Sequence, residues 1–162
     1  PMLAMGNAMS TFTAQNMGAG KIDRVKEGYR MCYVIVLTAG AVLCVMYQLA
    51  GGAFVSLFLD SGSSEAYSVG LSYVKFLSFF YSFIGLKAST DGLLRGAGDV
   101  TAFTVANLVN LAIRVSVTNL FAPIYGIQVA WMAVPLGWAA NYVISFGWYL
   151  TGKWKKVRVI KK

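Results

Sequence analysis

The sequence contains no histidine, and only six of its 162 residues are acidic. The lack of histidine excludes metal sites that need imidazole ligands and nucleophilic triads that need a histidine base. Only 12% of the residues are charged, whereas soluble domains average about 25%. With 57% hydrophobic residues and a mean hydropathy of +0.62, the composition is typical of a membrane protein. We therefore expect no enzyme, no metal site and no cofactor.

Cysteine is also scarce, and the two cysteines lie in one apolar run. Their spacing places Cys32 and Cys44 about three turns apart on a helix. This separation is too long for a disulfide bond within the helix. We expect two free, buried thiols.

The net charge of +8 at first suggests a nucleic-acid partner. However, residues 31–59 and 115–152 contain no charged residue at all. Basic residues outside long charge-free stretches are typical of membrane proteins that follow the positive-inside rule. The expected partner is therefore a lipid bilayer, with no role for nucleic acid.

Five apolar segments predict an all-α membrane protein, a polytopic helical bundle with about five transmembrane segments. The runs are continuous, whereas strands of a membrane barrel alternate with a period of two. The expected spans are residues 1–17, 29–59, 66–90, 101–121 and 126–150, followed by a basic tail over 151–162. The chain starts at Pro1 inside the first segment, without the basic region of a signal peptide, so we expect a fragment of a longer protein.

The basic residues predict how the segments are oriented. Alternating spans would put three connections on one side of the membrane, namely 18–30, 91–100 and 151–162. These connections and the adjacent Lys87 hold twelve of the fourteen basic residues, and 60–65 and 122–126 hold none. The positive-inside rule then places the C-terminus in the cytoplasm. Lys75 and Arg114 remain as basic residues inside spans.

A polar stripe runs along segment 101–121. Its members recur at helical spacing and share one face: Asn107, Asn110, Arg114 and Thr118. Lipid would leave these groups unpaired, so the face contacts protein or water. The stripe is either the wall of a hydrated transport cavity or a set of interhelical hydrogen bonds. No acid is expected inside any span, so Arg114 needs carbonyls, water, an acidic ligand or a carboxylate from elsewhere.

Two other segments carry candidate cavity residues. Lys75 and Phe79 share a face of segment 66–90. Lys75 either extends outward to the membrane surface or faces the cavity, and Phe79 is a candidate for stacking on a substrate. In segment 126–150, Asn141 is a further cavity candidate. Pro135 should kink this segment and is either a hinge or a fixed bend.

Two connections on the basic side are candidate gates. The first contains Gln15, Asn16, Gly18 and Gly20, and its Gly-Ala-Gly-Lys lacks the spacing of a phosphate loop. The second contains Asp91, Arg95, Gly96, Gly98 and Asp99. It either forms ion pairs that lock one conformation of an inner gate or is a solvated turn.

These connections carry a family resemblance. The matching residues are Gln15-Asn16-Met17-Gly18-Ala19-Gly20-Lys21, Leu93-Leu94-Arg95-Gly96-Ala97-Gly98-Asp99, and the end of the chain from Gly137-Trp138 to Lys155-Lys156. Over essentially its whole length, the sequence resembles the C-terminal part of a multidrug and toxic compound extrusion (MATE) transporter.

The resemblance implies twelve helices in two six-helix lobes around a central cavity. The five segments would be the end of helix eight and helices nine to twelve, and the N-terminal lobe would be the missing partner. Such transporters export organic cations and other drugs by alternating access, in exchange for Na⁺ or H⁺. Coupling usually relies on membrane-embedded acids. Gln15 and Arg95 would stabilise a gate or the lobe.

Two alternatives stay open. A lipid-linked oligosaccharide flippase of the same superfamily would need a cationic cavity, which Arg114 and Lys75 would favour. A non-transporting membrane scaffold is the other. In each case we expect a multi-pass protein of a bacterial plasma membrane.

Overall fold

The computed structural model describes residues 1–59 and 65–156, and within these ranges it is helical and contains no strand. The elements are α1 (Met2–Gly18), α2 (Ile22–Ser56), α3 (Glu65–Ser78), α4 (Tyr81–Gly96), α5 (Val100–Tyr125), α6 (Ile127–Thr151) and the short 3-10 helix η1 (Lys153–Lys156). This confirms the predicted all-α fold. The predicted 60–65 connection, apart from Glu65, and the end of the basic tail (157–162) lie outside the described residues.

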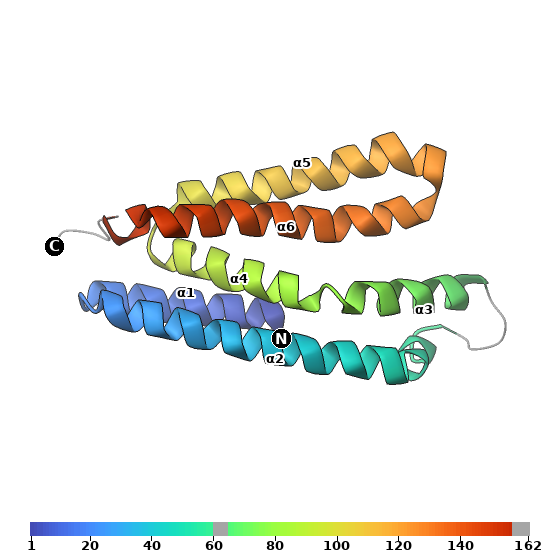
Figure 1. Cartoon of the computed structure of the whole chain (residues 1–162), viewed down its shortest axis with the longest axis horizontal. Coiled ribbons are helices and arrows are strands. Elements are labelled where there is room, and N and C mark those ends of the chain that lie inside the picture. Colours follow the sequence, from blue (N-terminus) through green and yellow to red (C-terminus); the bar gives the residue numbers. More distant parts are fainter. Residues whose placement is uncertain (60–64, 157–162) are drawn as a thin grey trace.

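The helices are arranged in three layers (Figure 1). The antiparallel pair α5 and α6 lies on one side, and α1 and α2 lie on the other. Between them, α4 and α3 follow each other end to end along the length of the molecule. α4 contacts α1, α2, α5 and α6, so it is the helix through which the two sides are joined.

Three helices, α2, α5 and α6, are each long and apolar enough to cross a membrane. α3 and α4 meet the same criteria together, as one span bent by 56°. α2 begins at Ile22, earlier than predicted, because Asp23 and Lys26 are paired at 2.7 Å on its first turn. Charged residues therefore extend this helix beyond its apolar part.

The helix of the predicted segment 66–90 differs from a single straight helix in two respects. It is broken between Ser78 and Tyr81, although no proline or glycine lies there. The carbonyl of Lys75 accepts hydrogen bonds from the Ser78 hydroxyl (2.7 Å) and from the Gln48 amide of α2 (2.9 Å). Side-chain donors that compete for a helical carbonyl bend the helix, which accounts for the break.

The second difference is at the end of this segment, where α4 continues to Gly96. Residues 91–96 are therefore helical and not part of a connection. Their glycines pack directly on α1: a Cβ atom on Gly92 would lie 2.1 Å from the Gly6 carbonyl oxygen, and one on Gly96 would lie 2.2 Å from that of Ser10. Small residues let two membrane helices approach this closely.

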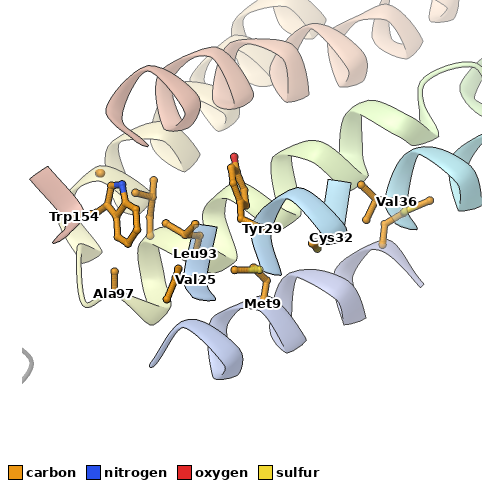
Figure 2. Close-up of a cluster of buried hydrophobic side chains, with 11 residues drawn as sticks. Met9, Val25, Tyr29, Cys32, Val36, Leu93, Ala97 and Trp154 are labelled. Carbon is orange, nitrogen blue, oxygen red and sulfur yellow. The ribbon is translucent and has the colours of Figure 1, made fainter. Parts of the chain in front are cut away.

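A buried apolar cluster joins α1, α2, α4 and η1. Figure 2 shows Val25 and Tyr29 of α2 near Leu93 of α4, with Val36 further along α2. Trp154 belongs to the same cluster and is fully buried, with its ring stacked on that of Tyr149. Cys32 and Cys44 are free, as predicted; Cys32 is buried, whereas Cys44 is only partly buried.

The α1–α4 contact predicts a specific sensitivity to side-chain size. Gly92→Ala should lower stability by roughly 1–3 kcal/mol, because the added methyl group collides with the backbone of α1. Gly147→Ala is the matched control, since nothing lies within 4 Å of the added Cβ atom and alanine favours a helix. Thermal unfolding in detergent measures both variants. Equal melting temperatures would contradict the close packing.

Candidate functional site

A buried ion pair lies at the centre of the helices. The Lys87 ammonium is 3.0 Å from Asp91 Oδ2, one turn further along α4. The lysine side chain is 15% exposed and the aspartate side chain 7%. No acid was expected inside a span, because segment 66–90 was predicted to end just before Asp91. The helix instead continues past the carboxylate, to Gly96.

Two further helices hold the carboxylate of Asp91. From α5, the Asn107 amide donates to Oδ2 at 3.1 Å. From α6, the Ser145 hydroxyl donates to Oδ1 at 2.7 Å. Asn107 also accepts a hydrogen bond from the Lys87 ammonium at 3.0 Å, so one amide bridges both charges. The four side chains Lys87, Asp91, Asn107 and Ser145 are called the α4 polar cluster below.

The cluster borders a cleft of about 290 Å³ between α1, α4 and α5. Charged and amide groups line it, including Asn7, Lys87, Asp91, Arg95 and Asn107, and Phe103 contributes an aromatic ring. Arg95 spans the cleft: it donates to Asn7 Oδ1 at 2.8 Å and lies 5.6 Å from the centre of the Phe103 ring. Polar groups that are held in place beside the guanidinium of Arg95 are suited to binding and orienting a polar solute.

The rest of the polar stripe on α5 faces α6. Asn110 lies against Gly137, where a Cβ atom would come within 2.3 Å of the Asn110 oxygen. That oxygen and the nitrogen of Asn141 are buried without a hydrogen-bond partner within the described residues. Ser145 is 3.4 Å from Asn141 Oδ1, but its single proton serves the nearer Asp91. Buried amide atoms of this kind are commonly satisfied by ordered water.

Arg114 and Thr118 lie further along α5 and also face α6. The Arg114 side chain packs on the same Gly137 as Asn110, where a Cβ atom would lie 2.9 Å from Arg114 Cγ. With Thr118, it lines an open groove of about 460 Å³ between α5 and α6. Within the described residues, Arg114 forms no ion pair. The predicted stripe is thus divided between the α4 polar cluster (Asn107) and the α5–α6 interface with its groove (Asn110, Arg114 and Thr118).

The remaining cavity candidates do not join the cluster. The Lys75 stem packs against Gly51 of α2, and the Phe79 side chain is 64% exposed. Pro135 lies inside the uninterrupted α6 and borders a small apolar pocket with Phe80 and Phe83. These three residues remain predictions without a common site.

The first predicted gate is a tight turn between α1 and α2. Gly20 adopts a φ of +69°, and the amide of Lys21 donates to the Asn16 carbonyl at 2.8 Å. The Asn16 side chain is buried and donates to the Phe12 carbonyl. Gln15 is exposed, and a Cβ atom on Gly18 would meet nothing within 4 Å. This turn therefore fixes the angle between two helices.

The second predicted gate is shorter than expected. Asp91, Arg95 and Gly96 belong to α4, so the connection to α5 is limited to Ala97–Asp99, with Gly98 at a φ of +82°. Asp99 caps α5 by accepting from the Ala102 amide at 3.3 Å. It also accepts from the Trp148 indole of α6 at 2.7 Å. Neither Asp99 nor Arg95 forms an ion pair within the described residues.

Three functional candidates were not predicted from the sequence: Lys87, Ser145 and Trp148. The signal for Lys87 was its spacing of four residues from Asp91, which places both side chains on one helix face. Ser145 stands four residues after Asn141 in the same way. Only the structure shows that Lys87 and Ser145 both contact the carboxylate of Asp91.

The chain resembles known proteins in sequence and in fold. Residues 1–135 match the family model described as MatE. The chain belongs to the MATE family. It is 28% identical over 160 residues to the probable multidrug resistance protein YpnP of Bacillus subtilis (strain 168), covering 98% of this chain and 36% of that protein. It is 23% identical over 164 residues to the probable multidrug resistance protein YoeA of the same strain, covering 99% and 35%.

A solved structure shares the fold. It shows the inward-facing conformation of a multidrug resistance MATE family transporter of the MOP superfamily. The two chains superimpose with a TM-score of 0.80 at 16% sequence identity, over 99% of this chain and 35% of that one. This MATE chain thus spans 35–36% of the length of the relatives that it matches.

The contact between Asp99 and Trp148 predicts a measurable loss. Trp148→Phe keeps an aromatic ring but removes the indole proton that Asp99 accepts. Hydrogen bonds to charged groups contribute about 1.5–3 kcal/mol, so the free energy of unfolding should fall by this amount. Trp131→Phe is the control, because Trp131 packs on Tyr73 and Phe76 and its indole forms no hydrogen bond within the described residues. A loss no larger than the control's would count against the contact.

Proposed function

We propose that this chain is part of the C-terminal lobe of a twelve-helix exporter of drugs and organic cations that works by alternating access. Membership of the MATE family supports the proposal, as does the similarity to two probable multidrug resistance proteins. The N-terminal lobe would be supplied by the rest of the full-length protein. The setting would be a bacterial plasma membrane, with the C-terminus in the cytoplasm.

The observation that best supports transport over scaffolding is the α4 polar cluster. It places Lys87 and Asp91 on a helix that, together with α3, is apolar enough to span a membrane, and it adds Asn107 from α5 and Ser145 from α6. Charged groups inside membrane spans are costly and commonly mark the path of a solute or an ion. The cleft beside the cluster, which Lys87, Asp91 and Arg95 line, supports a solute path there.

The flippase remains a second candidate, with less support than the sequence suggested. Its cationic cavity relied on Lys75 and Arg114. Lys75 packs against Gly51 of α2, whereas Arg114 lines the groove between α5 and α6. The cationic side chains that line the cleft between α1, α4 and α5 are already engaged: Lys87 pairs with Asp91, and Arg95 contacts Asn7 and Ser10 of α1.

We further propose that export is driven by the entry of Na⁺ or H⁺. The resemblance to the family carries this part of the proposal. Among the described residues, Asp91 is the one acid with a buried side chain in the middle part of a helix, and Asp99 is a helix cap.

Ethidium export by cells carrying the full-length gene tests the proposed function. Cells expressing the gene should accumulate less ethidium than cells with an empty vector. Arg114→Ala should change this accumulation by several-fold if the groove between α5 and α6 meets the substrate. Arg24→Ala, in the first turn of α2, is a control for the loss of one positive charge. Unchanged accumulation on expressing the intact gene would argue against drug export.

A further inference from the structure

Both oxygens of the Asp91 carboxylate are engaged. Oδ1 accepts from the Ser145 hydroxyl, Oδ2 accepts from the Asn107 amide, and the Lys87 ammonium lies 3.0 Å from Oδ2. These groups come from α4, α5 and α6, so the carboxylate is enclosed from three sides. A cation that binds here would compete with the Lys87 ammonium for the carboxylate.

The Lys87 ammonium lies where a metal cation would lie. It is 3.0 Å from a carboxylate oxygen and 3.0 Å from the amide oxygen of Asn107. Carboxylate and amide oxygens are also the groups that bind hard metal cations in proteins. The ammonium, however, is attached to the same helix as Asp91, four residues away, so helix movements do not separate the two charges.

We propose that Lys87 is a tethered counter-ion for Asp91, which keeps the α4 polar cluster neutral without the binding or release of Na⁺ or H⁺. A sodium ion would have to displace an ammonium that cannot diffuse away. A proton on Asp91 would leave the charge of Lys87 unpaired in a buried position, which is strongly unfavourable. Asp91 is then a packing and positioning residue and not the acid that couples transport to an ion gradient.

The surrounding charges agree with this assignment. Lys87, Asp91 and Arg95 are the charged residues that line the adjacent cleft. Arg95 extends the charged face of α4 by one turn and is directed to Asn7 and Ser10 of α1. No second carboxylate among the described residues lies at this site to compete with Asp91 for Lys87. As a statement about coupling, the inference rests on the proposed function.

The test measures how ions stabilise the full-length protein in detergent. Melting temperatures are recorded in sodium chloride against choline chloride, and at mildly acidic against neutral pH. Wild type and the double variant Lys87→Met/Asp91→Asn are both charge-balanced at this site. Their melting temperatures should therefore respond equally to sodium and to acid. A response of the wild type that exceeds that of the double variant would overturn the proposal.

The single variant Lys87→Met gives the complementary result. It leaves an unpaired carboxylate, so its melting temperature should rise with sodium or acid by several degrees more than that of the double variant. Lys87→Arg should restore the response of the wild type, and Lys75→Met, a lysine outside the cluster, should not alter it. No greater response in Lys87→Met than in the double variant would contradict the proposal. If Lys87→Met does not fold, the comparison of wild type with the double variant still tests the counter-ion role of Lys87.

The result is separable from the proposed function. A full-length protein that exports no ethidium but shows the expected ion responses would refute the proposed function and leave the counter-ion role intact. Export of ethidium together with stabilisation of the wild type by sodium through Asp91 would refute the counter-ion role alone.

Discussion

A charged group inside an apolar bundle must be paired, and in this chain α4 meets that requirement within itself. Lys87 and Asp91 lie one turn apart on this helix, with the ammonium 3.0 Å from the carboxylate. Asn107 of α5 and Ser145 of α6 donate hydrogen bonds to the same carboxylate. Buried polar groups that are left unsatisfied are costly, so the positions of α5 and α6 are constrained by these hydrogen bonds. The two sides of the molecule meet at this point, because α4 contacts both.

On another face of α4, the packing depends on glycines, which have no side chain to keep the neighbouring helix away. Gly92 lies against the backbone of Gly6 in α1, too close for any Cβ atom. Helices without a hydrophobic driving force between them associate through such close packing and through interhelical hydrogen bonds. Both kinds of contact are present on α4, on different faces. The bend at Ser78 then directs α3 along α2, where Gln48 holds the broken turn.

Much of the architecture follows from the sequence, because long apolar runs have one compatible backbone conformation in a membrane. The helices were predicted on this basis, the free cysteines from their spacing, and the family resemblance from the motifs of the connections and of the C-terminal end. The end of α4 was not predicted. A charged residue was taken to mark the edge of a span, whereas Asp91 is buried and paired with Lys87 of the same helix. The break at Ser78 was not predicted either, because it depends on a donor from α2 that local sequence does not reveal.

The candidate site was predicted only in part. The stripe on α5 correctly identified a polar face, but spacing alone does not tell which neighbour each residue meets. Asn107 meets Asp91, whereas Asn110 and Arg114 both meet Gly137, and Arg114 also lines the groove between α5 and α6. A double-mutant cycle on Lys87 and Asp91, measured by unfolding of the full-length protein, tests most directly whether this pair holds the structure. The pair predicts a coupling free energy of roughly 1–3 kcal/mol. Losses that add to within about 0.5 kcal/mol would contradict it.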